Sequence, residues 1–328
     1  CLRFLRKRIR IGNIYIWVRS YKAGLRAGTY IIMNAFHSFW SEPNKIKNNG
    51  EIRLPDYEQL TAVLSALKWR QYNGNIRMIT DSCGREYLED IGLTWIWNDI
   101  DTELDSLSGT VDPFLFWAAG KLWALRTMPA PCVMLDTDMI IWENVDTLIA
   151  GYDVTAAHPE DLNPNVYPEV SSFTFNGNYS IPEEWDLSLR AANTAFLCIK
   201  DEELKSYYTA SVMEFSKHLA EGCTDPVKSM CFAEQRILPM CTAVKHKRLG
   251  YLFDTAEVYS QSVATHTWGF KRVLDLNENA REQLCMRMIK RIYEDFPEYA
   301  DKLQNCRDLI KYLDKYNKSK KVLAQNEK

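Results

Sequence analysis

The sequence has no Cys-x-x-Cys pair and no zinc-like spacing of cysteine and histidine. Its nine cysteines are an odd number, and some lie inside apolar runs, as in residues 196–199. Free, buried thiols in a reducing compartment fit this pattern better than a disulfide framework does. We therefore expect a cytoplasmic protein that is held together by its hydrophobic core.

Long apolar runs and an excess of positive charge are also missing. No stretch reaches the roughly 20 apolar residues that span a bilayer, so we do not expect an integral membrane protein. The formal net charge is -3, which argues against a nucleic-acid partner because such partners favour a basic protein. With 46% hydrophobic and 12% aromatic residues, the 328 residues can bury one large core.

The first part of the chain lacks acidic residues. Residues 1–41 contain lysines and arginines but no aspartate or glutamate. We interpret residues 1–32 as a basic leader outside the folded domain, because a strand-like run starts at Met33. The alternative is that this leader, or the basic tail at 318–321, touches the inner face of a membrane. The predicted domain then covers 33–275, and 276–328 form a C-terminal helical extension with a frayed tail.

Predicted strands and helices alternate along the chain. Apolar runs with strand character occupy 33–40, 76–80, 94–97, 132–135, 152–157, 195–199 and 257–263. Apolar residues at helical spacing mark 60–69, 86–88, 114–127, 201–221, 231–238, 277–293 and 303–313. This alternation predicts an α/β fold with a mostly parallel sheet flanked by helices.

Two carboxylates lie two residues apart in Asp136-Thr137-Asp138, between the apolar runs 132–135 and 139–142. In an extended chain, side chains at i and i+2 point to the same side, so both can bind one cation. Carboxylate oxygens favour Mg²⁺ or Mn²⁺, whose remaining positions a substrate diphosphate can fill. Ligands of α/β sheets bind beyond the carboxyl ends of strands, where this pair falls. The alternative is that both carboxylates only accept hydrogen bonds from nearby backbone N–H groups.

Two further features bear on this pair. Asp99 and Asp101 have the same spacing, but polar residues follow at 102–105, so we interpret that pair as a solvated turn. Lys121 lies in the predicted helix 114–127, which leads into the strand before Asp136. We expect Lys121 to reach the same sheet edge and contact a phosphate, with a solvated lysine as the alternative.

Five segments follow one another in an informative order. They are an N-terminal strand, Asp136-Thr137-Asp138, Asn193-Thr194-Ala195, Glu234-Gln235 and the late segment 266–271, His-Thr-Trp-Gly-Phe-Lys. Over residues 33–271 the chain resembles GT-A glycosyltransferases of glycosyltransferase family 8, the glycogenin and lipopolysaccharide-galactosyltransferase type. It also resembles an uncharacterised bacterial family of glycosyltransferase-like proteins. The resemblance implies a GT-A fold and transfer of a sugar from a nucleotide-sugar donor, a UDP-sugar first of all, to an acceptor hydroxyl.

The family pattern also implies metal ligands. In the family, both aspartates and a late histidine hold the ion, so the resemblance implies Asp136, Asp138 and His266 as ligands of Mn²⁺ or Mg²⁺. Without the resemblance, His266 can equally be a packed, hydrogen-bonded histidine. The late family motif is His-x-x-Gly-x-x-Lys-Pro-Trp, whereas Lys271 comes one residue early and Arg272 follows it. This departure leaves a phosphate contact of Lys271 open.

The resemblance implies further residues around the donor. His37 and Asp81, at the ends of the first two strands, would lie near the nucleotide base and ribose. Asn193 and Gln235 match positions that offer polar side chains to the sugar or the reacting centre, and Glu234 is the nearby carboxylate. As alternatives, His37 can satisfy a loop, Asp81 can cap a helix, and Glu234 and Gln235 can form the polar face of a helix.

The acceptor and the reaction class are less determined. By resemblance we expect a glycan or glycolipid acceptor in bacterial surface-glycan synthesis. His158, Glu160 and Asp161 follow a predicted strand and can supply a catalytic base, an acceptor contact or only a solvated loop. A strand ending in Asp-x-Asp also resembles haloacid-dehalogenase-type phosphatases, whose first aspartate is a nucleophile. A non-catalytic glycan-binding or nucleotide-sugar-binding module is the third alternative.

Overall fold

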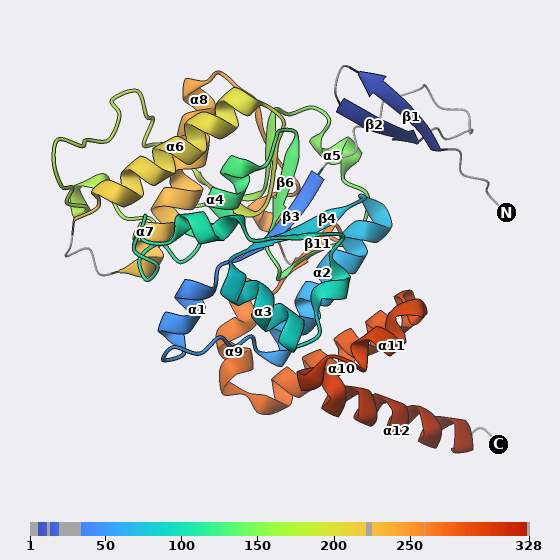
Figure 1. The fold of residues 1–328 in the computed structure, drawn as a ribbon. Coiled ribbons are helices and arrows are strands. Elements are labelled where there is room, and N and C mark those ends of the chain that lie inside the picture. Colours follow the sequence, from blue (N-terminus) through green and yellow to red (C-terminus); the bar gives the residue numbers. More distant parts are fainter. Residues whose placement is uncertain (1–5, 12–13, 20–33, 221–224, 259, 327–328) are drawn as a thin grey trace.

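The computed structural model describes residues 6–11, 14–19, 34–220, 225–258 and 260–326 (Figure 1). Met33, the predicted start of the domain, lies outside the described residues. Within the basic leader, β1 (Arg6–Ile11) pairs antiparallel with β2 (Ile14–Arg19). None of the described helices is both long and apolar enough to cross a bilayer.

The strands from residue 34 onward are β3 (Asn34–Phe39), β4 (Ile76–Thr80), β5 (Ile100–Asp101), β6 (Cys132–Leu135), β7 (Met139–Ile141), β8 (Val154–Glu160), β9 (Ala191–Ile199), β10 (Leu249–Tyr251) and β11 (Ala264–His266). In the described part of the chain, seven of them form one sheet in the order β10-β8-β9-β6-β3-β4-β5. β9 runs antiparallel to β6 and β8, and the other neighbours are parallel. A separate antiparallel ladder joins β7 to β11. The predicted α/β fold with a mostly parallel sheet is confirmed.

Helices lie on both sides of this sheet (Figure 1). They are α1 (Ser41–Lys47), α2 (Asp56–Tyr72), α3 (Ser82–Asp90), α4 (Ala119–Thr127), α5 (Asp146–Ile149), α6 (Glu202–His218), α7 (Pro226–Cys231), α8 (Ile237–Val244), α9 (Lys271–Leu276), α10 (Glu278–Asp295), α11 (Ala300–Leu303) and α12 (Ile310–Asn326). A π-helical turn, η4 (Phe232–Arg236), joins α7 to α8. The side chains of Asp81, Asp201 and Asn277 accept backbone N–H groups at the starts of α3, α6 and α10, which fixes where these helices begin.

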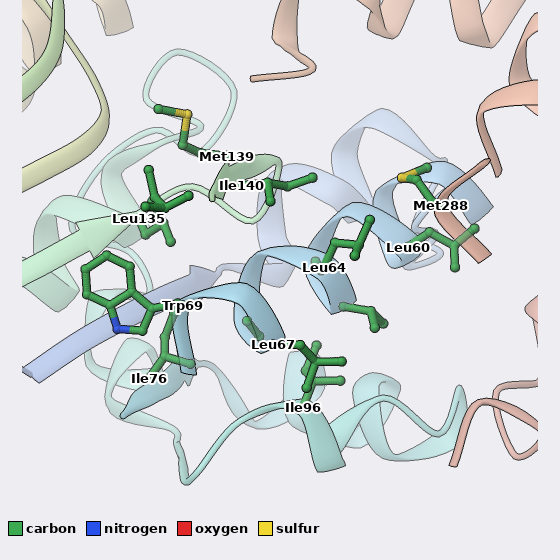
Figure 2. Packing of buried hydrophobic residues seen from close by; sticks show 14 of the residues in the cluster. Leu60, Leu64, Leu67, Trp69, Ile76, Ile96, Leu135, Met139, Ile140 and Met288 are labelled. Atoms are coloured by element: carbon green, nitrogen blue, oxygen red, sulfur yellow. The ribbon is translucent and has the colours of Figure 1, made fainter. Parts of the chain in front are cut away.

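Successive residues of the central strands point to opposite faces of the sheet, and both faces are covered. Val133 of β6 belongs to a cluster that includes residues of α2, α10 and α12, whereas the next residue, Met134, belongs to a cluster with residues of α4, α6 and α8. Figure 2 shows the first of these two clusters, where Leu60 of α2 lies beside Met288 of α10. A strand buried on both faces needs a continuous apolar run, which is what residues 132–135 supply. The C-terminal helices share this core.

Two predicted strands are wrong. Residues 94–97 contain a 3₁₀ turn, η1 (Thr94–Ile96), and the edge strand is β5, which includes the Asp101 that we expected in a turn. Ile100 pairs with Met78 of β4, so pairing along the free sheet edge outweighs the polar local sequence. The described residues of 257–263 do not form a strand either, because β11 begins at Ala264, where the chain meets β7.

Three predicted boundaries also differ from the structure. α4 begins at Ala119 rather than at residue 114. β8 continues through His158 to Glu160, because β9 is long enough to pair with it as far as Ala191. The segment 318–321, which we expected to fray, continues α12 as a helix. β10 was not predicted.

Candidate functional site

The turn from Asp136 to Asp138 joins β6 to β7 at the carboxyl end of a central strand. The Asp136 N–H donates to the Ala195 carbonyl of β9 at 2.8 Å, and the Asp136 carbonyl accepts from the Met139 N–H at 3.0 Å. Since the strands on both sides of the turn are buried, the backbone that carries the two carboxylates is held firmly. This is the sheet edge at which α/β folds bind ligands.

His266 reaches this turn through the ladder between β7 and β11. In the ladder His266 is opposite Met139, and the N–H of the next residue, Thr267, donates to the Asp138 carbonyl at 3.2 Å. The side chains of Asp136, Asp138 and His266 form a group, among the described residues, whose ligand atoms all lie within 4.8 Å of one another. The structure thus brings together the three residues that the resemblance implied as metal ligands.

Asp138 is only 5% exposed, and a lysine and a histidine lie beside its carboxylate. Lys271 Nζ lies 2.9 Å from Oδ2, and His266 Nε2 lies 3.6 Å from Oδ1. Burial by itself raises the pKa of Asp138, but Lys271 and His266 outweigh burial and hold the pKa well below its usual range. Lys271 also pairs with Glu58 at 3.1 Å. Asp138 is therefore an anion at neutral pH, and Lys271 is tied to it.

The carboxylate of Asp136 pairs with Lys121, whose Nζ lies 2.9 Å and 3.2 Å from the two oxygens. The same ammonium lies 2.5 Å from Oε1 of Glu234, which is buried and also accepts a hydrogen bond from the Thr194 hydroxyl. Burial lowers the pKa of Lys121, but Asp136 and Glu234 outweigh it and raise the pKa above its usual value. Lys121 thus links the metal-ligand group to a buried carboxylate. Its phosphate contact stays a prediction.

These residues fit a divalent cation. Two carboxylates and an imidazole are donors that Mn²⁺ accepts, and the carboxylates also suit Mg²⁺. The Thr267 hydroxyl, directly after His266, is buried and has no hydrogen-bond partner among the described residues. A buried polar atom of this kind calls for an explanation, and a bound ligand group is one.

A cleft of about 600 Å³ adjoins the metal-ligand group. His266 lines it from β11, and His158, Glu160 and Asn193 line it from β8 and β9. Asn193 Nδ2 donates to Glu160 Oε1 at 3.2 Å, and the His158 ring stacks on Phe253 with ring centres 5.3 Å apart. The cleft therefore combines groups that hydrogen-bond hydroxyls with apolar walls, as ligand sites commonly do.

Glu234 and Gln235 lie in the π-helical turn η4, a kind of turn that is frequent at functional sites. Their side chains have different partners. Glu234 pairs with Lys121, whereas Gln235 Oε1 accepts a hydrogen bond from the Tyr167 hydroxyl at 2.5 Å. The two side chains therefore do not form one polar face of a helix. Their catalytic roles stay a prediction.

His37 has partners in the core. It is fully buried, its Nε2 lies 3.0 Å from the Ser65 hydroxyl, and its Nδ1 accepts from Trp97 Nε1 at 3.0 Å. Burial lowers the pKa of His37 to about 3 against the opposing charge of Asp138, so its ring is neutral at pH 7. Ser65 in turn donates to the Met139 carbonyl at 2.5 Å, directly behind the turn that carries Asp138.

Asp81 caps α3, the alternative that the sequence left open. It accepts the Gly84 N–H at 2.6 Å, and its other oxygen accepts both the N–H and the hydroxyl of Ser41 at 2.8 Å. Neither Asp81 nor His37 is among the described residues that line the cleft. Contact of either residue with a nucleotide stays a prediction.

Sequence reasoning did not single out Glu58, Tyr167, Phe253 or Thr267. Thr267 lies inside the late segment 266–271, so its position was a signal. Glu58 and Tyr167 meet Lys271 and Gln235 only in the folded chain, and a single sequence shows no sign of such pairs.

Residues 33–306 match the family described as a family of unknown function (DUF6734). The chain belongs to this family. No functionally curated protein matches the DUF6734 chain. The resemblance to glycosyltransferase family 8 is therefore not confirmed by a family match.

Several solved structures resemble this DUF6734 protein in part. Mouse xyloside xylosyltransferase 1 is 11% identical, with 67% of this chain and 84% of that chain covered and a TM-score of 0.34. Glycosyltransferase GlyE of Streptococcus pneumoniae is 11% identical, with 70% and only 46% covered and a TM-score of 0.36. Galactosyltransferase LgtC is 11% identical, with 67% and 73% covered and a TM-score of 0.33. Because these TM-scores lie below 0.5, any assignment of activity has to come from the site itself.

Proposed function

We propose that the protein is a metal-dependent glycosyltransferase of the GT-A type, which moves a sugar from a nucleotide-diphosphate sugar to an acceptor hydroxyl. One observation carries the proposal. Asp136, Asp138 and His266 converge within 4.8 Å at the carboxyl end of a central strand, and His266 also lines a cleft with room for a sugar. A cation site beside a polar cleft suits metal-dependent transfer from a diphosphate.

Asp136, Asp138 and His266 would hold Mn²⁺ or Mg²⁺. When bound, such an ion stabilises the negative charge that collects on a departing diphosphate. Lys271 is a second source of positive charge, because Asp138 and Glu58 raise its pKa above the usual value although burial lowers it. Its flexible side chain can turn from Asp138 to a phosphate oxygen, where its charge would be most useful in the transition state.

Asn193 and Glu160 would contact the sugar, since both line the cleft and are hydrogen-bonded to each other. Gln235 is the next candidate, with Tyr167 orienting its amide. Glu234 would act indirectly, because its carboxylate is buried against Lys121. Through Lys121, Glu234 keeps Asp136 in position to bind the ion.

The finer parts of the proposal rest on the resemblance stated above. They are a UDP-sugar donor, retention at the anomeric carbon, a glycan or glycolipid acceptor and a role in bacterial surface-glycan synthesis. The proposed cytoplasmic location rests on the cysteine pattern, and the proposed contact with a membrane rests on the basic residues at either end.

The test is release of nucleoside diphosphate from a panel of nucleotide-sugars, with Mn²⁺, Mg²⁺ or EDTA. We expect turnover of at least one donor with a divalent ion and none with EDTA. Release of inorganic phosphate from phosphate monoesters, without use of any nucleotide-sugar, would replace the proposal by the phosphatase alternative. Metal-dependent binding of a donor without turnover would leave a binding module.

A further inference from the structure

Helix α9 directs apolar side chains toward solvent. Val273 is 50% exposed and Leu276 is 79% exposed, and Phe270, immediately before the helix, is 56% exposed. Residues three apart lie on one face of a helix, so Val273 and Leu276 are neighbours. A surface helix normally turns its apolar face inward. We call Phe270, Val273 and Leu276 the α9 strip.

The opposite face of α9 explains why the strip points outward. Lys271 is bound to Asp138 at 2.9 Å and to Glu58 at 3.1 Å, and Leu274 is 5% exposed. Turning the helix to bury the strip would break both ion pairs and expose Leu274. The inward lysine that serves the candidate active site therefore fixes the apolar residues on the outside.

The α9 strip is continuous with the cleft. Phe270 lines the cleft together with His266, and the helix starts at the next residue. At 1.5 Å per residue, the strip extends roughly 9 Å from the rim of the cleft. Inside the cleft, Glu160 and Asn193 supply polar groups, whereas Phe253 and Val258 add apolar wall. The surface thus has a polar end next to the metal-ligand group and an apolar end outside.

We propose that the acceptor is an amphiphile, with a hydroxyl-bearing sugar in the cleft and an alkyl chain that lies on the α9 strip. The inference rests on the proposed function and narrows its acceptor to sugars that carry an apolar chain. A free polar glycan would leave Phe270, Val273 and Leu276 in water, whereas a chain running out of the cleft covers all three. Covering apolar surface would then strengthen acceptor binding.

The test measures binding of octyl β-glucoside and octyl β-galactoside against their methyl counterparts, below the micellar concentration, without donor or metal. Ligand-detected saturation-transfer NMR gives both the affinity and the protons in contact. In the native protein we expect an octyl glycoside to bind on the order of tenfold more tightly than its methyl counterpart, with contact at the chain protons. Val273→Ser/Leu276→Ser should remove this preference.

Val227→Ser/Leu187→Ser is the matched control, because it changes the same residue types at other exposed positions, 47% and 42%, that do not line the cleft. The control should keep the preference. Equal binding of octyl and methyl glycosides to the native protein, or a preference that survives Val273→Ser/Leu276→Ser, would overturn the inference. So would flotation with phosphatidylcholine vesicles that depends on the strip while monomeric octyl glycosides show no preference, since the strip would then contact a membrane.

The two proposals fail in different ways. Strip-dependent binding of the chain in a protein that turns over no nucleotide-sugar would reject the transferase and keep an amphiphile site. Metal-dependent transfer with no preference for the chain would keep the transferase and reject the amphiphilic acceptor.

Discussion

The chain contains two Asp-x-Asp pairs in opposite surroundings. Asp136 and Asp138 follow the buried central strand β6, and Asp138 is 5% exposed. Asp99 and Asp101 lie at the edge strand β5, where the Asp99 side chain is 57% exposed and pairs with Arg77. The spacing of the carboxylates is the same at both places, so the spacing cannot be what makes one of them a candidate metal site.

The difference lies in what surrounds the carboxylates. At the first pair, Lys121 and Lys271 meet the carboxylates where little water screens their charge, and the His266 ring lies beside Asp138. At the second pair, solvent screens the single exposed ion pair. A short acidic motif therefore becomes a site when the fold adds burial and converging partners.

The largest expected effect is loss of activity on replacing the buried aspartate. Asp138→Asn removes a charged oxygen ligand with almost no change in shape. Metal-dependent release of nucleoside diphosphate should fall on the order of 1000-fold, roughly 4 kcal/mol of transition-state stabilisation. Steady-state kinetics with a nucleotide-sugar that the native protein turns over measures this loss.

The second pair supplies the control for that experiment. Asp101→Asn makes the same chemical change at the same position of its motif, on the edge strand. Its turnover should remain within about twofold of the native value. Equal losses in Asp138→Asn and Asp101→Asn would mean that the two pairs do not differ in function.

A smaller effect is expected on stability from Lys121→Met. The change leaves Glu234, buried at 2% exposure, without its cation, and uncompensated buried charges typically cost about 3 kcal/mol or more. Urea unfolding at pH 7 measures the loss. Lys121→Met/Glu234→Gln should recover part of it, because the neutral amide no longer needs a cation. Native stability of Lys121→Met would show that the buried pair contributes little.

Part of this site was predictable from local sequence. The apolar run 132–135 marks a strand buried on both faces, and the two aspartates follow it directly, so the position of the turn is readable from the residues alone. His266 was implied only by the resemblance, because the strand that carries it is three residues long and depends on pairing with β7. A strand of three residues is too short to show an alternation of apolar and polar residues in the sequence.

The remaining contacts depend on tertiary structure. Lys121 was expected at the correct sheet edge, but its ion pair with Glu234 joins α4 to η4, which lies beyond β9 in the sequence, and the spacing of the residues does not predict it. The ion pair between Lys271 and Glu58 of α2 likewise forms only in the folded chain, so the spacing of the two residues does not predict it. Tertiary structure also explains why the edge strand is β5 and not the predicted 94–97. Pairing with β4 determines which residues form this strand, and their local strand propensity does not.

A still smaller effect concerns the buried support of the first pair. Ser65 donates to Met139 behind the turn and is hydrogen-bonded to His37, which burial keeps neutral by lowering its pKa to about 3. The unfolded chain takes up this proton near its ordinary pKa of about 6.5, so stability present above that pH is lost as the pH falls toward 3. His37→Gln can keep both hydrogen bonds and does not titrate.

The slope of stability against pH tests this point. Between pH 6 and pH 4, the free energy of unfolding of His37→Gln should fall less steeply than that of the native protein, by up to about 1.4 kcal/mol per pH unit. Urea unfolding at pH 6, 5 and 4 compares the slopes directly, and other titrating groups are common to both proteins. Parallel slopes would mean that His37 is protonated in the folded state.

The smallest effect is expected at the exposed pair. Asp99→Asn removes the ion pair with Arg77, whose side chain is 36% exposed, from an edge where water and salt already screen it. Such pairs contribute less than about 1 kcal/mol, so unfolding and turnover should both stay near native values. A decrease in the free energy of unfolding of more than about 2 kcal/mol, or a fall in turnover like that of Asp138→Asn, would show that the edge pair matters as much for stability or activity as the central pair does. Exposure of the carboxylates would then no longer explain why two identical spacings behave differently.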